Sequence, residues 1–232
     1  MIIDIETSVA LIKQTPAPIL FIDTCSLLDI IRVPSHPNVK LSHLEGAKEA
    51  VKKAKSNSIY LVITETVEME YKDNLSKTCV ELERYTTKFA ATGEKIVNSI
   101  ECVELSYNFY ISGIEEIRLA AELEKIANNV IDSSLILEEN QECIHSAHER
   151  TKHYQAPAQR GKSESKDCVI IEHFLELSKR LREEGLTNPL IFITNNSSDY
   201  GKAPNPKPPL NLEFGNLDIA YCNNLKWALS LV

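Results

Sequence analysis

The stretch ILFIDTCSLLD, residues 19–29, decides the fold. Its first four residues are all apolar, and Asp23 follows them directly. Such a short apolar run is typical of a strand that is buried on both faces, as the strands of parallel sheets are. A helical pattern then runs from about Thr24 to Arg32. Asp23 is therefore expected at the carboxyl end of a parallel strand, where open α/β sheets bind ligands.

Three further apolar runs lie downstream and also predict buried strands. They are Ile59 to Ile63, Leu190 to Thr194, and Leu217 to Cys222, the last interrupted by Asp218. Helical patterns separate the runs, one of them from about Ser42 to Lys55. Strands that alternate with helices imply right-handed crossovers and a layered fold. The sequence predicts an α/β protein with three α/β/α layers and a central, mainly parallel sheet of four to five strands.

The 232 residues are expected to form one domain with an insertion. Residues 75–148 are rich in Glu, Lys, Ala, Ile and Leu, and this composition predicts several helices without a strand, which we interpret as a helical insertion. The segment GKAPNPKPP, residues 201–209, has four prolines in nine residues and predicts a loop.

Composition favours a cytoplasmic protein. The six cysteines are scattered without CxxC pairs, which is typical of free thiols in a reducing compartment. The opening MIIDIETSVALIKQ has no basic leader, so no signal peptide is expected, and no run is apolar enough for a membrane span.

The formal net charge of −8 argues against binding nucleic acid through bulk electrostatics. A local exception lies between residues 150 and 166, where positive charges gather. This segment is a candidate nucleic-acid contact or simply a solvated basic loop. Its candidate contacts are Arg150, Lys152, Arg160, Lys162 and Lys166.

Four acidic residues are candidates for a functional site, and each has a structural alternative. Asp23 could instead cap the helix after it. Glu70 and its neighbour Glu68 both flank a predicted helix stripe, and periodicity does not choose between them. Asp167 opens the helical pattern DCVIIEHFLELSKRL, where an anion is also favoured by free amides and the helix dipole. Asp199 follows the third run in ITNNSSDYG, where a structural turn is the alternative.

The order of these acids matters more than any one of them. Three follow separate predicted strands or lie in their crossovers, and the fourth begins the helix that precedes the third run. All four can therefore converge at one edge of the sheet. An oxygen-only cluster suits Mg²⁺ or Mn²⁺.

Four segments that contain these acids resemble the PIN-domain nuclease superfamily. They are FIDTCSLLD, VITETVEMEY, KDCVIIEHFLEL and FITNNSSDYG, which occur in the order of the family motifs. The resemblance selects Glu70 over Glu68. It departs from the commonest pattern at the fourth motif, where Asn196 replaces an aspartate and Asp199 follows three residues later. We therefore carry the role of the fourth acid to Asp199, with Asn196 as a weaker contact.

The resemblance implies a metal-dependent nuclease, most simply an endoribonuclease that hydrolyses phosphodiester bonds with metal-activated water. Asp23 and Asp167 would be the primary ligands of one or two Mg²⁺ or Mn²⁺ ions, with Glu70 and Asp199 completing the catalytic site. Hydroxyl and amide groups would support these ligands: Thr24, Ser26, Thr194 and Asn196. The expected partner is nucleic acid, RNA before DNA, with a homodimer and a regulatory protein partner as further options and no membrane.

Other classes of protein fit the sequence less well. An aspartyl phosphotransferase would need an acid where Cys25 stands, and a metal-dependent adhesion module would need serines at Cys25 and Leu27. Zinc binding by Cys143, His145, His148 and His153 is disfavoured because no second cysteine lies nearby. Two alternatives stay open, namely an inactive PIN-like scaffold that binds RNA or assembles with other proteins, and a structure-specific DNA nuclease.

Overall fold

The computed structural model describes residues 2–102, 118–160 and 165–232. Within them, six strands form one sheet in the order β1-β4-β3-β2-β5-β6, and every neighbouring pair is parallel. The strands are β1 (Ile2–Ile3), β2 (Ile19–Ile22), β3 (Tyr60–Thr64), β4 (Ser134–Leu137), β5 (Leu190–Ile193) and β6 (Ile219–Cys222). The expected α/β class with a parallel sheet is confirmed, and the sheet is wider than the four to five strands predicted.

The central strand β2 explains why the sheet is buried. All four of its side chains are inaccessible to solvent, and its neighbours are β3 on one side and β5 on the other. Phe21 of β2 contacts Phe174, whose ring centroid lies 4.7 Å away, and Phe174 in turn contacts Phe192 of β5 at 5.5 Å. Burial of this apolar surface on both faces is the main force that holds the layers together.

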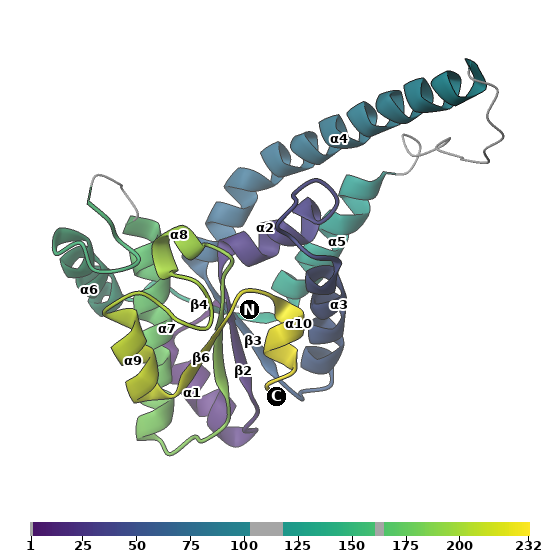
Figure 1. Cartoon of the computed structure of the whole chain (residues 1–232). Helices are drawn as coiled ribbons and strands as arrows, with labels where there is room; N and C mark the ends of the chain where they lie inside the picture. The colour runs from purple at the N-terminus through teal and green to yellow at the C-terminus, as the bar shows by residue number, and fades with distance from the viewer. Residues whose placement is uncertain (1, 103–117, 161–164) are drawn as a thin grey trace.

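Helices cover both faces of the sheet (Figure 1). One layer contains α1 (Ile5–Gln14), α6 (Gln141–Lys152), α7 (Ser165–Glu183) and α9 (Leu210–Leu217), with α1, α6 and α9 packed against α7. The other contains α2 (Thr24–Arg32), α3 (Leu41–Lys55), α5 (Leu119–Asp132) and α10 (Leu225–Leu229), where α3 contacts both α5 and α10. The three-layer arrangement that the sequence predicts is therefore present.

Helix α4 (Glu65–Cys102) begins at the sheet and then extends away from it (Figure 1). At about 1.5 Å per residue its 38 residues span roughly 57 Å. Its first turns pack on α2 and α5, whereas the far half carries exposed apolar side chains such as Tyr85, Phe89 and Ile96. Helices α4 and α5 account for much of the segment interpreted as an insertion.

The sequence pattern does not predict two of the strands, β4 and β1. Residues 75–148 were expected to contain no strand, but β4 lies there and pairs with both β1 and β3, so this expectation was wrong. Only three of the four residues of β4 are apolar, and so short a run within helix-like composition does not reveal its structure by periodicity alone. Strand β1 has only two residues and is formed by its pairing with β4.

The proline-rich segment after β5 forms a loop, as its sequence predicts. It lies between α8 (Ser197–Tyr200) and α9. Gly201 begins it with a φ of 100°, and a Cβ at this position would lie 2.9 Å from the carbonyl oxygen of Asn205. Glycine is therefore required at this turn, which directly follows the Asp199-Tyr200 pair.

Candidate metal centre

Asp23 lies at the carboxyl end of β2, at the position that precedes α2. Its side chain is only 1% exposed, and it makes no capping hydrogen bond to the helix. The Thr194 hydroxyl, at the end of the neighbouring strand β5, donates to Oδ2 at 2.7 Å. Within the described residues, Oδ1 is buried and has no hydrogen-bond partner. The backbone N–H groups of Thr24 and Cys25, at the start of α2, still interact with the carboxylate and lower its pKa, so capping of α2 remains an alternative role for Asp23.

The environment of Asp23 raises the pKa of its carboxyl group to about 6. Burial is the largest cause, the hydrogen bond from Thr194 acts in the opposite direction, and the negative charge of Glu70 raises the pKa further. Both raising effects disfavour the ionised form, and a nearby cation would reverse them. Asp23 is thus a buried acid whose charge the surrounding protein does not neutralise.

Glu70 lies in the second turn of α4, next to the start of α2. The Thr24 hydroxyl donates to Oε2 at 2.8 Å, and the Lys166 ammonium lies 3.7 Å from Oε1. Glu68 instead accepts a hydrogen bond from Lys72 at 2.7 Å on the same helix. Of these two glutamates, Glu70 is the one whose charge acts on Asp23.

Asp167 lies in the first turn of α7 and is half-buried. The Tyr200 hydroxyl donates to its backbone carbonyl oxygen at 3.2 Å and lies 3.5 Å from Oδ1. Burial raises the pKa of Tyr200 well above its ordinary value, and the charges of Asp167 and Asp23 raise it further. The Cys25 thiol responds in a similar way, with its pKa raised by burial and then by Asp23, Asp29 and Asp167. Asp23 and Asp167 therefore act on the same two neighbours.

Asp199 lies in the short helix α8 and is 6% exposed. The Gln159 amide donates to Oδ1 at 2.8 Å, and the Asn196 amide donates to Oδ2 at 2.8 Å. Asp199 is connected to the other acids through its neighbour Tyr200, whose hydroxyl contacts Asp167. The geometry thus relates Asp23, Glu70 and Asp167 through shared neighbours and charges, while Asp199 is linked to them through α8.

The predicted supporting residues have separate tasks. Thr194 donates to Asp23 and accepts a hydrogen bond from the backbone N–H of Asn196 at 3.0 Å, so it links the first and fourth motifs. Ser26 donates instead to the carbonyl oxygen of Ile193 at 3.1 Å, which fixes the start of α2 to the end of β5. Thr24 orients Glu70, as described above.

Two residues near the acids were not identified from the sequence. Tyr200 directly follows Asp199, and a buried tyrosine hydroxyl usually finds a partner, but the partner Asp167 is 33 residues away in the chain. Gln159 comes from the loop before α7 and reaches both Asp199 and the carbonyl oxygen of Ser198. Nothing in the local sequence distinguishes Gln159 from an ordinary polar loop residue.

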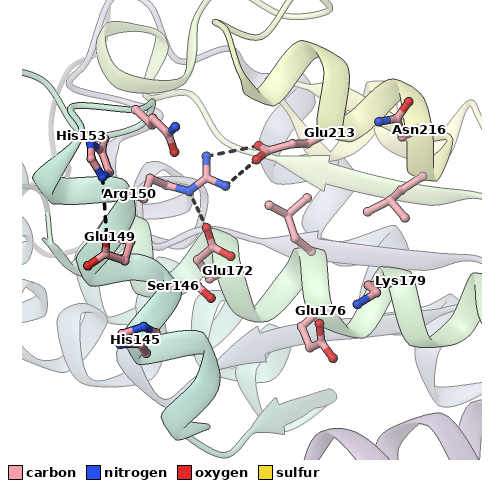
Figure 2. A pocket seen from close by; sticks show the side chains of 13 residues that line it. His145, Ser146, Glu149, Arg150, His153, Glu172, Glu176, Lys179, Glu213 and Asn216 are labelled. Atoms are coloured by element: carbon pink, nitrogen blue, oxygen red, sulfur yellow. Dashed lines mark hydrogen bonds and ion pairs between the residues drawn. The ribbon is translucent and has the colours of Figure 1, made fainter.

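Arg150 was predicted to contact nucleic acid, and the structure contradicts this. Its side chain is only 4% exposed and lies between Glu172 of α7 and Glu213 of α9 (Figure 2). It donates to them at 2.5 and 2.7 Å and also to the carbonyl oxygen of Ala156 at 2.8 Å. The buried cation neutralises acids in the helical layer and is not available to phosphate groups.

The other basic residues differ in how accessible they are. Lys152 is exposed at the end of α6 and pairs with Glu149 at 3.2 Å, while Arg160 is exposed in the following loop. Lys166 is half-exposed and pairs with Glu70. Lys162 lies outside the described residues. These three described residues stay candidates for contact with nucleic acid.

A cleft of about 640 Å³ lies between α6, α7 and α9, and Arg150, Glu172 and Glu213 form part of its lining (Figure 2). His145, Glu149, Glu176 and Lys179 are among its lining residues. None of the four candidate acids lines it. This cleft is therefore separate from the Asp23 site.

The side-chain donor atoms around Asp23 show whether the site could hold a divalent metal. Its candidate ligands are carboxylate oxygens, which suit Mg²⁺ and Mn²⁺, and Asp23 Oδ1 is a buried oxygen without a hydrogen-bond partner. In the described part of the chain, no three His, Cys, Asp or Glu side chains are gathered closely enough to hold a metal ion. The donor chemistry fits, and the acids would have to exchange some of their present contacts for metal coordination.

Comparisons with known proteins identify the family of this chain. Residues 20–200 match the PIN domain, and this range contains all four candidate acids. No curated protein and no solved structure matched the chain. In the described residues, no helix is both long and apolar enough to cross a membrane. The matched range covers most of the chain and agrees with the parallel α/β/α fold, and we conclude that this protein belongs to the PIN domain family.

Proposed function

We propose that this protein is a metal-dependent endonuclease that hydrolyses phosphodiester bonds, with RNA as the preferred substrate. The observation that carries the proposal is Asp23, a buried carboxylate at the sheet edge where α/β proteins bind ligands. Its pKa is raised, and within the described residues one of its oxygens has no hydrogen-bond partner. PIN domain proteins are usually nucleases, and this family membership suggests phosphodiester hydrolysis as the reaction at the Asp23 edge of the sheet.

Asp23 and Asp167 would hold the metal, and Glu70 and Asp199 would complete or orient the site. A bound Mg²⁺ or Mn²⁺ supplies positive charge beside the phosphate and activates water for attack. Thr194 fixes one oxygen of Asp23 and leaves the other for coordination. Thr24 likewise fixes Oε2 of Glu70, whereas Lys166 lies beside Oε1. Partners of this kind, which orient metal ligands, are a general feature of metal sites.

Positive side chains near the site would guide the substrate. Lys152 and Arg160 are exposed on the segment that leads into α7, the helix that begins beside Asp167. The protein as a whole is acidic, so this local charge would have to offset repulsion of the phosphate backbone. RNA is preferred in the proposal because the motif pattern resembles that of small RNA-cutting relatives.

A scaffold without nuclease activity is the second candidate. It is favoured by one observation, namely that the acids are held by Lys166, Gln159 and Asn196 and do not form a ready-made group of three ligands. Under this alternative, the same surface would bind RNA or another protein without cutting.

A cleavage assay separates these candidates. The purified protein would be incubated with transfer RNA, single-stranded RNA and single-stranded DNA, each with Mg²⁺, Mn²⁺ or EDTA. We expect internal cleavage of RNA with either metal, products with 5′-phosphate and 3′-hydroxyl ends, and none with EDTA. Cleavage that survives EDTA would contradict the metal mechanism. RNA binding without any cleavage would favour the scaffold, and preferential cutting of DNA would favour the DNA nuclease.

A further inference from the structure

Lys166 is a cation that pairs with Glu70, one of the four candidate acids. It lies in the first turn of α7, one residue before Asp167, and its ammonium is 3.7 Å from Glu70 Oε1 and 4.0 Å from Asp73 Oδ2. Its side chain is 51% exposed. The pairing joins α7 to α4, two helices that pack together. One positive charge of the protein is thus next to an acid that the proposed function assigns to a divalent metal.

Both oxygens of Glu70 already have partners in this arrangement. Thr24 donates to Oε2, and Lys166 lies beside Oε1. A hydroxyl can support a carboxylate that also binds a metal, because it leaves the charge of the carboxylate in place. An ammonium group neutralises that charge and competes directly with a metal for it. This difference singles out Lys166 among the contacts of Glu70.

We propose that Lys166 is an internal countercation that holds Glu70 until a divalent metal displaces it, and so lowers the metal affinity of the site. The inference rests on the proposed function, because it requires a metal at these acids.

The physical properties of this ion pair suit displacement. A lysine is a mobile point charge on a flexible stem, and half-exposed pairs of this kind contribute little to stability. Lys166 can therefore leave Glu70 without unfolding the protein. The Arg150 cluster shows the opposite arrangement, since its guanidinium is buried and makes several short hydrogen bonds.

The test is a calorimetric titration of the full chain with Mn²⁺ in the absence of nucleic acid. Removing a positive charge a few ångströms from a dication should tighten binding in Lys166→Gln by roughly three- to ten-fold. Lys166→Arg keeps the charge and should stay within about twofold of wild type. Lys72→Gln is the matched control, because Lys72 pairs with Glu68 on the same helix at 2.7 Å. It should change the affinity by less than about twofold.

The outcomes separate this inference from the proposed function. If Lys166→Gln binds Mn²⁺ with unchanged or weaker affinity, or if Lys72→Gln tightens binding equally, the countercation role is contradicted. Should Asp23→Asn still abolish Mn²⁺ binding in the same experiment, the metal site itself stands and only the role of Lys166 fails. A wild-type chain that binds no Mn²⁺ would contradict both.

Discussion

Arg150 and Asp23 are both buried charged residues, but the protein treats them in opposite ways. The Arg150 guanidinium lies between two glutamates and a backbone carbonyl, so its charge and its hydrogen-bonding groups are satisfied within the chain. Asp23 accepts a hydrogen bond from one hydroxyl group and has a negative neighbour in Glu70, and its other oxygen is buried without a hydrogen-bond partner in the part of the chain that the structure describes. Buried charges are stable when paired. Arg150 therefore serves the fold, whereas under the proposed function Asp23 receives a cation from outside.

The largest effect expected is on catalysis at Asp23. Asp23→Asn keeps the side-chain volume and removes the ligand charge, so RNA cleavage with Mn²⁺ should fall by at least about a thousandfold, or about 4 kcal/mol. Asp29→Asn is the matched control, because Asp29 is also buried in the α2 region but already accepts a hydrogen bond from Asn195 at 3.0 Å. Its cleavage rate should stay within about tenfold of wild type. Equal losses of cleavage rate in the two variants would show that Asp23 has no special role in catalysis.

The second effect concerns stability at Arg150. Arg150→Met leaves Glu172 and Glu213 without their shared cation, and breaking a buried ion pair in this way should lower the free energy of unfolding by about 3 kcal/mol. Lys152→Met, two residues away at an exposed pair, should change it by less than about 0.5 kcal/mol. Chemical denaturation of both variants measures the difference. A loss at Arg150 no larger than that at Lys152 would show that the cluster is not structural.

The third effect is a pH dependence that comes from Asp23. Its folded pKa of about 6 is above the ordinary value of 3.8, so between these pH values the folded state binds the proton more tightly than the unfolded state. In EDTA, the contribution of Asp23 to stability is therefore greatest at low pH and is lost as the pH rises through about 6. The loss should be on the order of 1–3 kcal/mol.

This pH dependence can be isolated by substitution. The difference in unfolding free energy between wild type and Asp23→Asn should change between pH 4 and pH 7, with the variant gaining relative stability at the higher pH. A difference that is constant across this range would show that Asp23 titrates as an ordinary exposed acid.

The smallest effect distinguishes Glu70 from Glu68. Glu70→Gln should reduce cleavage by about tenfold or more, because Glu70 acts on Asp23 and lies beside Lys166. Glu68→Gln removes only an exposed-face pair with Lys72 and should retain activity within about threefold. Initial cleavage rates of both variants, measured at saturating Mn²⁺, distinguish the two glutamates. A larger loss at Glu68 would overturn the assignment of the second motif.

The sequence predicted the central part of the fold because that part is encoded locally. The apolar runs of β2, β3, β5 and β6 are each contiguous, and α2 has the predicted bounds of Thr24 to Arg32. Strand β4 was missed because its apolar residues lie among helix-forming ones. Strand β1 was missed because two residues carry too little pattern. Its existence depends on a partner strand more than a hundred residues away in the chain.

The positions of the candidate acids in the fold were predictable, and their contacts were less so. Each acid follows a strand or opens a helix, so residue order alone indicated one edge of the sheet. The partners that define the chemistry come from other segments. Thr194 reaches Asp23 across 171 residues, and Lys166 reaches Glu70 from another helix. Arg150 was misassigned for the same reason, because its acids Glu172 and Glu213 are distant in sequence and turn an apparent surface charge into a buried one.

The most direct test of the central claim is thermal unfolding of wild type and Asp23→Asn, each in EDTA and in Mn²⁺ at neutral pH. A ligand that binds only the folded state raises the unfolding temperature. We predict that Asp23→Asn is the more stable protein in EDTA and that Mn²⁺ raises the unfolding temperature of wild type but not of the variant. Equal responses to Mn²⁺ in the two proteins would contradict the claim that the buried charge of Asp23 is arranged to bind a metal.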